Sequence, residues 1–142
     1  MILLDTNVVS EPMKAAGDAN VLAWLDAQHI ETLYLSTISL AELRFGIAVL
    51  PDGKRKNTLH SRLEERILPL FSGRILPFDA EASRAYAMLR ARARSAGQAI
   101  APEDGYIAAT AVTRGFSVAT RDVSPFDAVG LTVINPWNGM AH

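Results

Sequence analysis

The feature that most constrains the fold is the alternation of short apolar runs with longer segments of helical periodicity. The short runs predict buried strands at Met1–Leu4, Leu33–Leu35, Arg74–Leu76, Phe116–Ala119 and Leu131–Ile134. Segments with apolar residues at helical spacing lie among them, at Asp18–Gln28, Leu40–Leu50, Asn57–Phe71, Asp79–Ala96 and Pro102–Arg114. Strands separated by helices predict an α/β fold, in which a parallel sheet is covered by helices on both faces.

Composition narrows the class of protein. A chain of 142 residues with 49% apolar and 20% charged residues fits one globular domain with a sizeable core. The absence of cysteine excludes a disulfide framework, a thiolate zinc site and a thiol nucleophile. Asp5 interrupts the first apolar run too early for a signal peptide, and no apolar run approaches the ~18 residues of a membrane span. We therefore expect a cytoplasmic protein without a membrane association.

The basic residues are clustered although the net charge is only −1. One cluster runs from Lys54 to Arg66 and the other from Arg84 to Arg94. Arginine binds phosphate and carboxylate groups through two-point contacts, so either cluster is a candidate surface for RNA or for an acidic partner. The alternative is that both clusters are the solvated outer faces of amphipathic helices.

Four acidic residues follow predicted strands or begin the helices after them. Asp5 directly follows the first strand, and Asp122 follows the strand at Phe116–Ala119. We expect Glu42 in the first turn of the helix after the second strand, and Asp104 in the first turn of the helix that begins at Pro102. Ligands of open parallel sheets bind beyond the carboxyl ends of the strands. The sequence therefore predicts that Asp5, Glu42, Asp104 and Asp122 gather at one edge of the sheet.

Each acid also has a purely structural explanation. Ser39 and Glu42 match the spacing of a capping box, Asp104 belongs to an acidic helix start, and Asp5 and Asp122 are ordinary turn residues. Together, however, four carboxylates near one point repel by about 4 kcal/mol per close pair at an effective dielectric near 20. A divalent cation would compensate this repulsion, and all-oxygen ligands favour Mg²⁺ or Mn²⁺ over zinc.

Helical geometry selects Asp104 over its neighbour Glu103. Asp104 shares a face with Ile107 and Ala108, which must pack inward, whereas Glu103 is turned roughly 100° away. Because magnesium usually bridges carboxylates to substrate phosphates, the expected chemistry is phosphoryl transfer or phosphodiester hydrolysis.

Five motifs in order resemble those of a known family. They are Asp5-Thr6-Asn7, the helix that contains Glu42, Asp104-Gly105-Tyr106, Thr120-Arg121-Asp122 and the closing Asn135-Pro136-Trp137. The chain resembles PIN-domain ribonucleases, more narrowly the VapC-type toxins of type II toxin-antitoxin pairs and their FitB-like branch. The resemblance runs from Met1 to Trp137, which predicts a PIN domain over residues 1–137 and a short C-terminal tail over 138–142.

The resemblance implies a five-stranded parallel sheet and an endoribonuclease that depends on Mg²⁺ or Mn²⁺. By position, Asp5 and Asp104 correspond to the core metal ligands, Glu42 to a ligand or water-positioning group, and Asp122 to a more peripheral acid. Thr6 and Asn7 resemble residues that orient Asp5 and bound water, and Thr120 is placed with them. Many relatives have Asn in place of Asp122 and an Asp three residues later, where this chain has Pro125, so the position of the fourth acid departs from the family pattern.

The resemblance also implies partners. Such toxins are inhibited by a small antitoxin that binds promoter DNA and wraps the toxin, and an antitoxin arginine enters the acidic pocket of some of them. A homodimer, or a larger toxin-antitoxin assembly, is expected, with the helix Asp79–Ala96 as one candidate for the dimer contact. The toxin itself would contact promoter DNA only through the antitoxin.

Three aromatic residues are assigned from their positions. Trp24 and Phe45 are interpreted as core or antitoxin-groove residues, and Tyr106 as an exposed ring beside the site.

Two alternative functions stay open. One alternative is a catalytically silent PIN-like module that only binds a partner. Another is a haloacid-dehalogenase-like phosphatase, which needs a second acid where this chain has Asn7.

Overall fold

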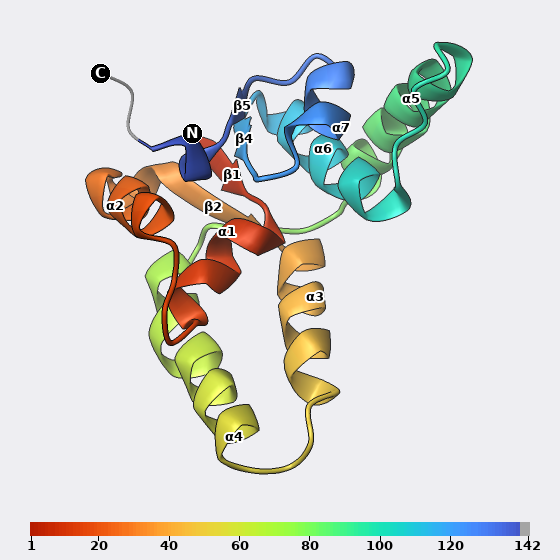
Figure 1. Ribbon diagram of the computed structural model, residues 1–142. Helices are drawn as coiled ribbons and strands as arrows, with labels where there is room; N and C mark the ends of the chain where they lie inside the picture. The colour runs from red at the N-terminus through yellow and green to blue at the C-terminus, as the bar shows by residue number, and fades with distance from the viewer. Residues whose placement is uncertain (140–142) are drawn as a thin grey trace.

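The sheet has five parallel strands, and all five strands predicted from the sequence are confirmed. The computed structural model describes residues 1–139. The strand order is β3-β2-β1-β4-β5, so the first strand lies at the centre (Figure 1). The strands are β1 (Ile2–Leu4), β2 (Leu33–Ser36), β3 (Ile75–Leu76), β4 (Ser117–Ala119) and β5 (Val133–Ile134).

Helices connect the strands in sequence. In the described part of the chain, the α-helices are α1 (Thr6–Ser10), α2 (Ala19–Ala27), α3 (Thr37–Ala48), α4 (Lys54–Ser61), α5 (Ala80–Ser95), α6 (Pro102–Arg114) and α7 (Val123–Ala128). A π-helical segment, Arg62–Ile67, continues α4. Short 3₁₀ turns lie at Glu11–Met13, Ile30–Thr32, Leu68–Phe71 and Pro136–Asn138. The five predicted helices are all present, whereas α1 and α7 were not predicted.

The pleat of the strands divides the core into two clusters, one on each face of the sheet. On β1, Leu3 packs into the cluster that contains α5, α6 and α7, and Leu4 packs into the cluster that contains α1 and α2. On β4, Val118 and Ala119 alternate in the same way. Both faces are therefore covered, as the near-continuous apolar strands predicted.

The structure differs from the predictions at the start of α3, which contains Glu42, and at Phe45. The helix begins at Thr37 rather than Leu40, because the hydroxyl of Ser36 accepts a hydrogen bond from the Ser39 amide and caps the helix. The predicted capping box of Ser39 and Glu42 is therefore wrong, and Glu42 lies in the second turn. Phe45 is 69% exposed, so its interpretation as a core residue is also wrong, whereas Trp24 is buried as expected.

The segment predicted as one helix over Asn57–Phe71 changes character along its length. It starts earlier, at Lys54, runs as α4 to Ser61, and then passes through the π-helical segment into a 3₁₀ turn. Pro69 lies in that last turn, where a residue without an amide hydrogen is tolerated.

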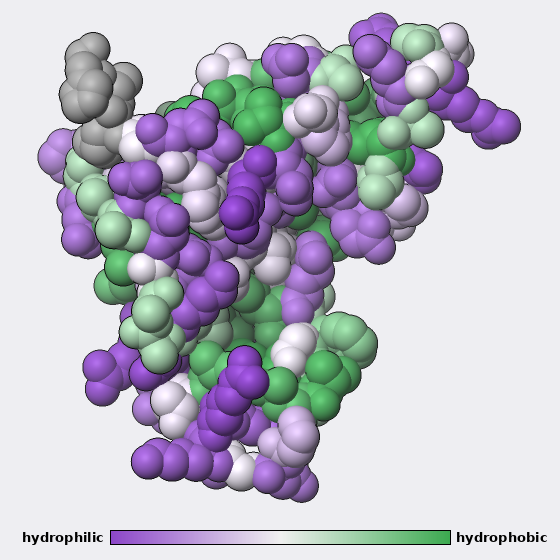
Figure 2. Space-filling view, in the orientation of Figure 1, coloured by the Kyte–Doolittle hydropathy of each residue, from purple (hydrophilic) through white to green (hydrophobic). Residues whose placement is uncertain are grey.

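Residues 37–67 form a projecting hairpin of helices, which we call the α3–α4 arm. Figure 1 shows α3 and α4 extending together away from the sheet. A groove of about 780 Å³ lies along them, with Leu43, Ile47 and Leu59 among its apolar lining residues. Figure 2 shows apolar surface on this part of the molecule, flanked by hydrophilic side chains.

Two expectations concern a membrane-spanning helix and the boundary of the domain. None of the helices within residues 1–139 has the length and apolarity needed to cross a membrane. The boundary between a domain ending at 137 and a tail over 138–142 stays a prediction. Residues 140–142 of that tail lie outside the described residues.

Candidate metal centre

Asp5 lies at the centre of the site, directly after the central strand. Its backbone amide donates to the Ala119 carbonyl, which continues the pairing of β1 with β4. Its side chain is the N-cap of α1: Oδ1 accepts a hydrogen bond from the Thr6 amide at 2.7 Å. Oδ2 accepts a hydrogen bond from the Thr120 hydroxyl at 2.8 Å. The carboxylate is only 5% exposed, so its orientation is fixed by these two bonds.

Three polar residues connect Glu42 and Asp122 to Asp5. The Thr6 hydroxyl donates to Glu42 Oε1 at 3.1 Å, which joins α1 to α3. Asn7 Nδ2 lies 3.4 Å from both Asp122 Oδ2 and the Thr120 hydroxyl. The Asp122 amide donates to that same hydroxyl at 3.0 Å. The residues predicted to support the site thus lie between its carboxylates.

Asp104 enters the site from the first turn of α6, which begins at Pro102. It is half-buried, whereas Glu103 is exposed, and Ile107 and Ala108 are buried as the helical geometry predicted. Among residues 1–139, no side-chain hydrogen bond joins Asp104 to another group, in contrast to Asp5, Glu42 and Asp122.

The electrostatics show that the acids share one region. Burial raises the pKa of Asp5, and the charge of Asp122 raises it further. Burial is also the main cause of the raised pKa of Glu42, to which the charges of Asp5, Glu103 and Asp104 add. The pKa of Asp104 is raised by burial and then by Asp5, Asp122 and Glu103. Each of the four predicted acids therefore acts on, or is acted on by, at least one of the others.

The effect of the Glu103 charge on the site was not predicted from the sequence. Its side chain is exposed, yet its charge acts on both Glu42 and Asp104. The available signal was its position immediately before Asp104, because a residue at a helix start remains near the same strand ends even when it faces solvent.

The carboxylates do not form a ready-made chelate. Within residues 1–139, no three acidic or histidine side chains converge closely enough to hold a metal ion together. The donors nevertheless fit a hard cation, since they are all oxygens and the positive charge needed to relieve their repulsion is missing from their hydrogen-bond partners. Mg²⁺ keeps several waters and is usually bound through only one or two carboxylates, so it does not require three convergent ligands.

Tyr106 differs in part from its predicted exposed position beside the site. The ring is half-buried and stacks on Tyr86, with 4.6 Å between the ring centroids and 13° between their planes. Phe78 contacts both rings edge-on. The Tyr106 ring therefore forms part of the contact between α5 and α6.

The fold and the site together define an α/β protein with an acidic site at the carboxyl ends of its parallel strands. Comparison with known proteins identifies the family. Residues 2–130 match the family model described as PIN domain. The chain is 62% identical over 137 residues to "VapC ribonuclease Y4jK" of Sinorhizobium fredii, covering 96% of this chain and 98% of that protein. It is 54% identical to "Toxin FitB" of Neisseria gonorrhoeae, covering 97% and 99%.

Solved structures agree with the sequence comparison. The structure described as "Structure of FitAB bound to IR36 DNA fragment" matches with a TM-score of 0.95 and 52% identity, covering 100% of this chain and 99% of that one. The "Crystal Structure of FitAcB from Neisseria gonorrhoeae" matches with a TM-score of 0.93 and 55% identity, covering 96% and 99%. The chain belongs to the PIN-domain family and, within it, to the VapC type that includes the FitB-like branch.

Proposed function

We propose that this chain is the toxin of a toxin-antitoxin pair and acts as a divalent-metal-dependent endoribonuclease. The observation that carries the proposal is the network in which Thr6, Asn7 and Thr120 hold Asp5, Glu42 and Asp122 at one edge of the sheet. Close relatives named as a VapC ribonuclease and a FitB toxin support the same activity.

The residues have distinct roles in this proposal. Asp5 and Asp104 bind Mg²⁺ or Mn²⁺, and Glu42 binds the ion or positions the water that attacks the phosphodiester. Asp122, exposed at the rim, is the most peripheral of the four. Thr6 and Thr120 keep the Asp5 carboxylate in one orientation through bonds to its two oxygens.

A bound divalent cation supplies two effects, since it lowers the pKa of a coordinated water and neutralises charge on the phosphate and the leaving oxygen. In this proposal the carboxylate of Glu42 accepts a proton or orients the attacking water. Burial raises its pKa. We expect cleavage of single-stranded or loop RNA to leave 5′-phosphate and 3′-hydroxyl ends.

The proposed partner is a small DNA-binding antitoxin. Similar structures are described as FitAB bound to a DNA fragment and as FitAcB, so those relatives form such complexes. On this chain, α3 exposes Phe45 (69%), and Val49 (63%) is exposed one turn later, directly after the helix. Exposed apolar area of this kind favours a protein partner. A homodimer is proposed as well.

The experiment is incubation of total RNA with the purified full-length protein, freed of antitoxin, in Mn²⁺ or Mg²⁺. Parallel reactions contain EDTA or the Asp104→Asn variant. We expect discrete cleavage products with metal and none in either control. Asp104 is the preferred position because its side chain holds no structural hydrogen bond within the described residues, whereas Asp5 is the cap of α1.

Two results would overturn the proposal. Cleavage that persists in EDTA or in the variant would show that the acids do not perform the reaction. A protein that neither cleaves RNA nor is stabilised by saturating Mn²⁺ would instead be a silent PIN-like binding module.

A further inference from the structure

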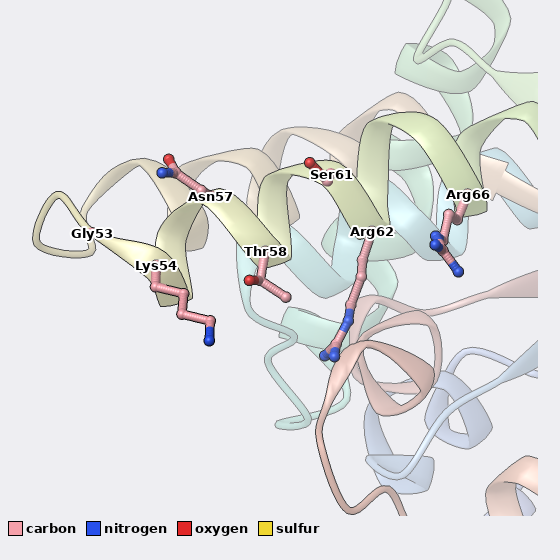
Figure 3. Close-up of a pocket in the computed structure, with 7 residues that line it drawn as sticks. All are labelled: Gly53, Lys54, Asn57, Thr58, Ser61, Arg62 and Arg66. Carbon is pink, nitrogen blue, oxygen red and sulfur yellow. The ribbon is translucent and has the colours of Figure 1, made fainter.

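The α3–α4 arm carries a row of basic side chains that the acidic site does not explain. Lys54, Arg62 and Arg66 line a shallow depression on α4 and its π-helical continuation, together with the neutral hydrogen-bonding residues Asn57, Thr58 and Ser61. No acidic residue lines this depression. Figure 3 shows the side chains of Lys54, Thr58, Arg62 and Arg66 pointing to the same side of the helix. We call these four residues the basic ridge.

No ion pair within residues 1–139 neutralises the charges of the ridge. The ion pairs formed by residues 1–139 join Lys14 to Glu11, Arg44 to Glu64 and Lys56 to Asp52. The three bases of the ridge take part in none of them. Arg62 instead donates to the carbonyl of Met13 at 2.6 Å, which fixes its guanidinium while leaving it positively charged.

Lys54 of the ridge lies at the N-terminus of α4, where basic residues are unfavourable. The first turn of α4 contains Lys54, Arg55 and Lys56, contains no acid, and has no side-chain cap at Gly53. Positive charges at a helix N-terminus are unfavourable, because the amide dipoles already make that end positive. Lys56 is offset by its bonds to the Ala48 carbonyl and to Asp52, whereas Lys54 of the ridge makes no ion pair within residues 1–139. A local rule broken in this way is typical of a functional surface.

The ridge is connected to the acidic site by the arm groove. Lys54, Thr58 and Arg62 line this groove as well as the depression, and Thr6 and Glu42 of the acidic site line the same groove. A polyanion is repelled by the carboxylates of the site, so it needs positive charge nearby to approach them. The bases of the ridge provide that charge beside a groove that Glu42 also lines.

We propose that the basic ridge binds the phosphodiester backbone of the substrate RNA and directs it along the arm groove to the acidic site. This inference rests on the proposed ribonuclease function, of which it names the substrate-binding surface. The neutral donors of Asn57, Thr58 and Ser61 add hydrogen bonds to phosphate or ribose oxygens between the charged contacts. Binding by such a surface depends on charge and is largely independent of base sequence.

The test uses Lys54→Glu, Arg66→Glu and the double variant in the full-length protein, and spares Arg62 because that residue anchors the Met13 carbonyl. Binding of a labelled single-stranded RNA is measured by fluorescence anisotropy on an Asp104→Asn background in EDTA. We expect the double variant to bind about tenfold more weakly, with a salt dependence reduced by about 0.7 in logarithmic slope for each lost phosphate contact. Arg94→Glu, a charge reversal on α5 that lines neither the groove nor the depression, should bind like the parent.

A second readout separates recognition from folding. Lys54→Glu should leave the thermal unfolding temperature unchanged or raise it, since it replaces a base with an acid at a helix N-terminus. With the acidic site intact and Mn²⁺ present, KM for RNA should rise while kcat stays the same. If wild-type protein cleaves RNA and the ridge variants cleave with the same kcat/KM, the inference is wrong although the proposed function holds.

Two further outcomes would assign the ridge to another ligand. Variants that bind RNA normally but lose affinity for the antitoxin would show that the ridge contacts a protein. Variants that lose affinity only for duplex DNA of the same length would show that it contacts promoter DNA. Either result overturns the RNA assignment. Failure of the wild-type protein itself to cleave RNA would instead count against the proposed function.

Discussion

At the carboxyl edge of the sheet, Asp5 is 5% exposed and both of its carboxylate oxygens accept hydrogen bonds, whereas on the α3–α4 arm the side chain of Arg44 is 53% exposed beside its partner Glu64. The acids of the edge are held together against their own repulsion, with a raised pKa at Asp5, Glu42 and Asp104. The Arg44–Glu64 pair faces solvent instead. The edge therefore gives up stability to hold its charges, whereas this pair is held at little cost.

The largest expected effect comes from Asp104. The Asp104→Asn variant should lower metal-dependent cleavage of RNA by about 1,000-fold, because a metal site contributes several kcal/mol to the transition state. In EDTA the same variant should be at least as stable as the wild type toward urea, since it removes a charge that Asp5 and Asp122 repel. If the variant is less stable than the wild type in EDTA, Asp104 contributes to folding, and the contrast between the edge and the arm is wrong.

The next effect concerns the support of Asp5. Thr120→Val removes the hydroxyl that donates to Asp5 Oδ2 and accepts from the Asp122 amide. Because Thr120 is fully buried, the variant should lose about 1–3 kcal/mol of unfolding free energy in urea denaturation. Thr120→Ser, which keeps the hydroxyl, is the matched control and should retain most of the stability and the cleavage activity. Equal losses in both variants would assign the effect to packing of the methyl group.

Glu11 offers a buried acid that has a cation beside it. Its carboxylate pairs with Lys14 at 2.7 Å and accepts from the Asp18 amide at 3.1 Å. The hydrogen bond with Lys14 is the main cause that lowers the pKa of Glu11 from its ordinary value of 4.5. Glu11→Gln should therefore cost about 1–2 kcal/mol of unfolding free energy at neutral pH.

The pH dependence gives the sign of that contribution. A carboxyl with a lower pKa in the folded state stabilises the fold above its unfolded pKa and loses this effect as pH falls through the folded value. The difference between wild type and Glu11→Gln should thus be constant above pH 4.5 and shrink below it. Urea unfolding at pH 7, 4.5 and 3 measures it, and a difference that grows on acidification would contradict the assignment.

The smallest effect is expected on the arm. Arg44 donates from Nε and Nη2 to the two oxygens of Glu64 at 2.8 and 3.0 Å, and the pair joins α3 to the π-helical segment. Because the pair is exposed, Glu64→Gln should change the unfolding free energy by less than about 1 kcal/mol, and the change should diminish in 1 M salt. A loss as large as that of Thr120→Val would remove the distinction between the two regions.

The sheet and the gathering of Asp5 and Asp122 at its edge were predictable because both follow from topology. Apolar runs predict strands, and in a parallel sheet the residues after each strand gather at one edge, so Asp5 and Asp122 were brought together by chain order alone. Asp104 was separated from Glu103 by helical geometry. Glu42 was assigned correctly to its helix although the start of that helix was misplaced by three residues.

The remaining features depend on contacts that a pattern does not encode. The helix α1 is only five residues long, too short to show a period, and its start is determined by the bond from the Thr6 amide to Asp5. The exposure of Phe45 depends on how far the arm projects from the sheet, and the stacking of Tyr106 on Tyr86 depends on where α5 crosses α6. Whether the carboxylates converge depends on side-chain torsions that neighbouring charges influence.

The central claim is that the acidic edge binds a divalent cation, and calorimetric titration of Mn²⁺ into the full-length, antitoxin-free protein tests it most directly. The account predicts saturable binding to the wild type at neutral pH and its loss in Asp104→Asn, with Glu64→Gln binding like the wild type. Equal binding by the wild type and Asp104→Asn, or the absence of saturable binding to the wild type, would contradict it.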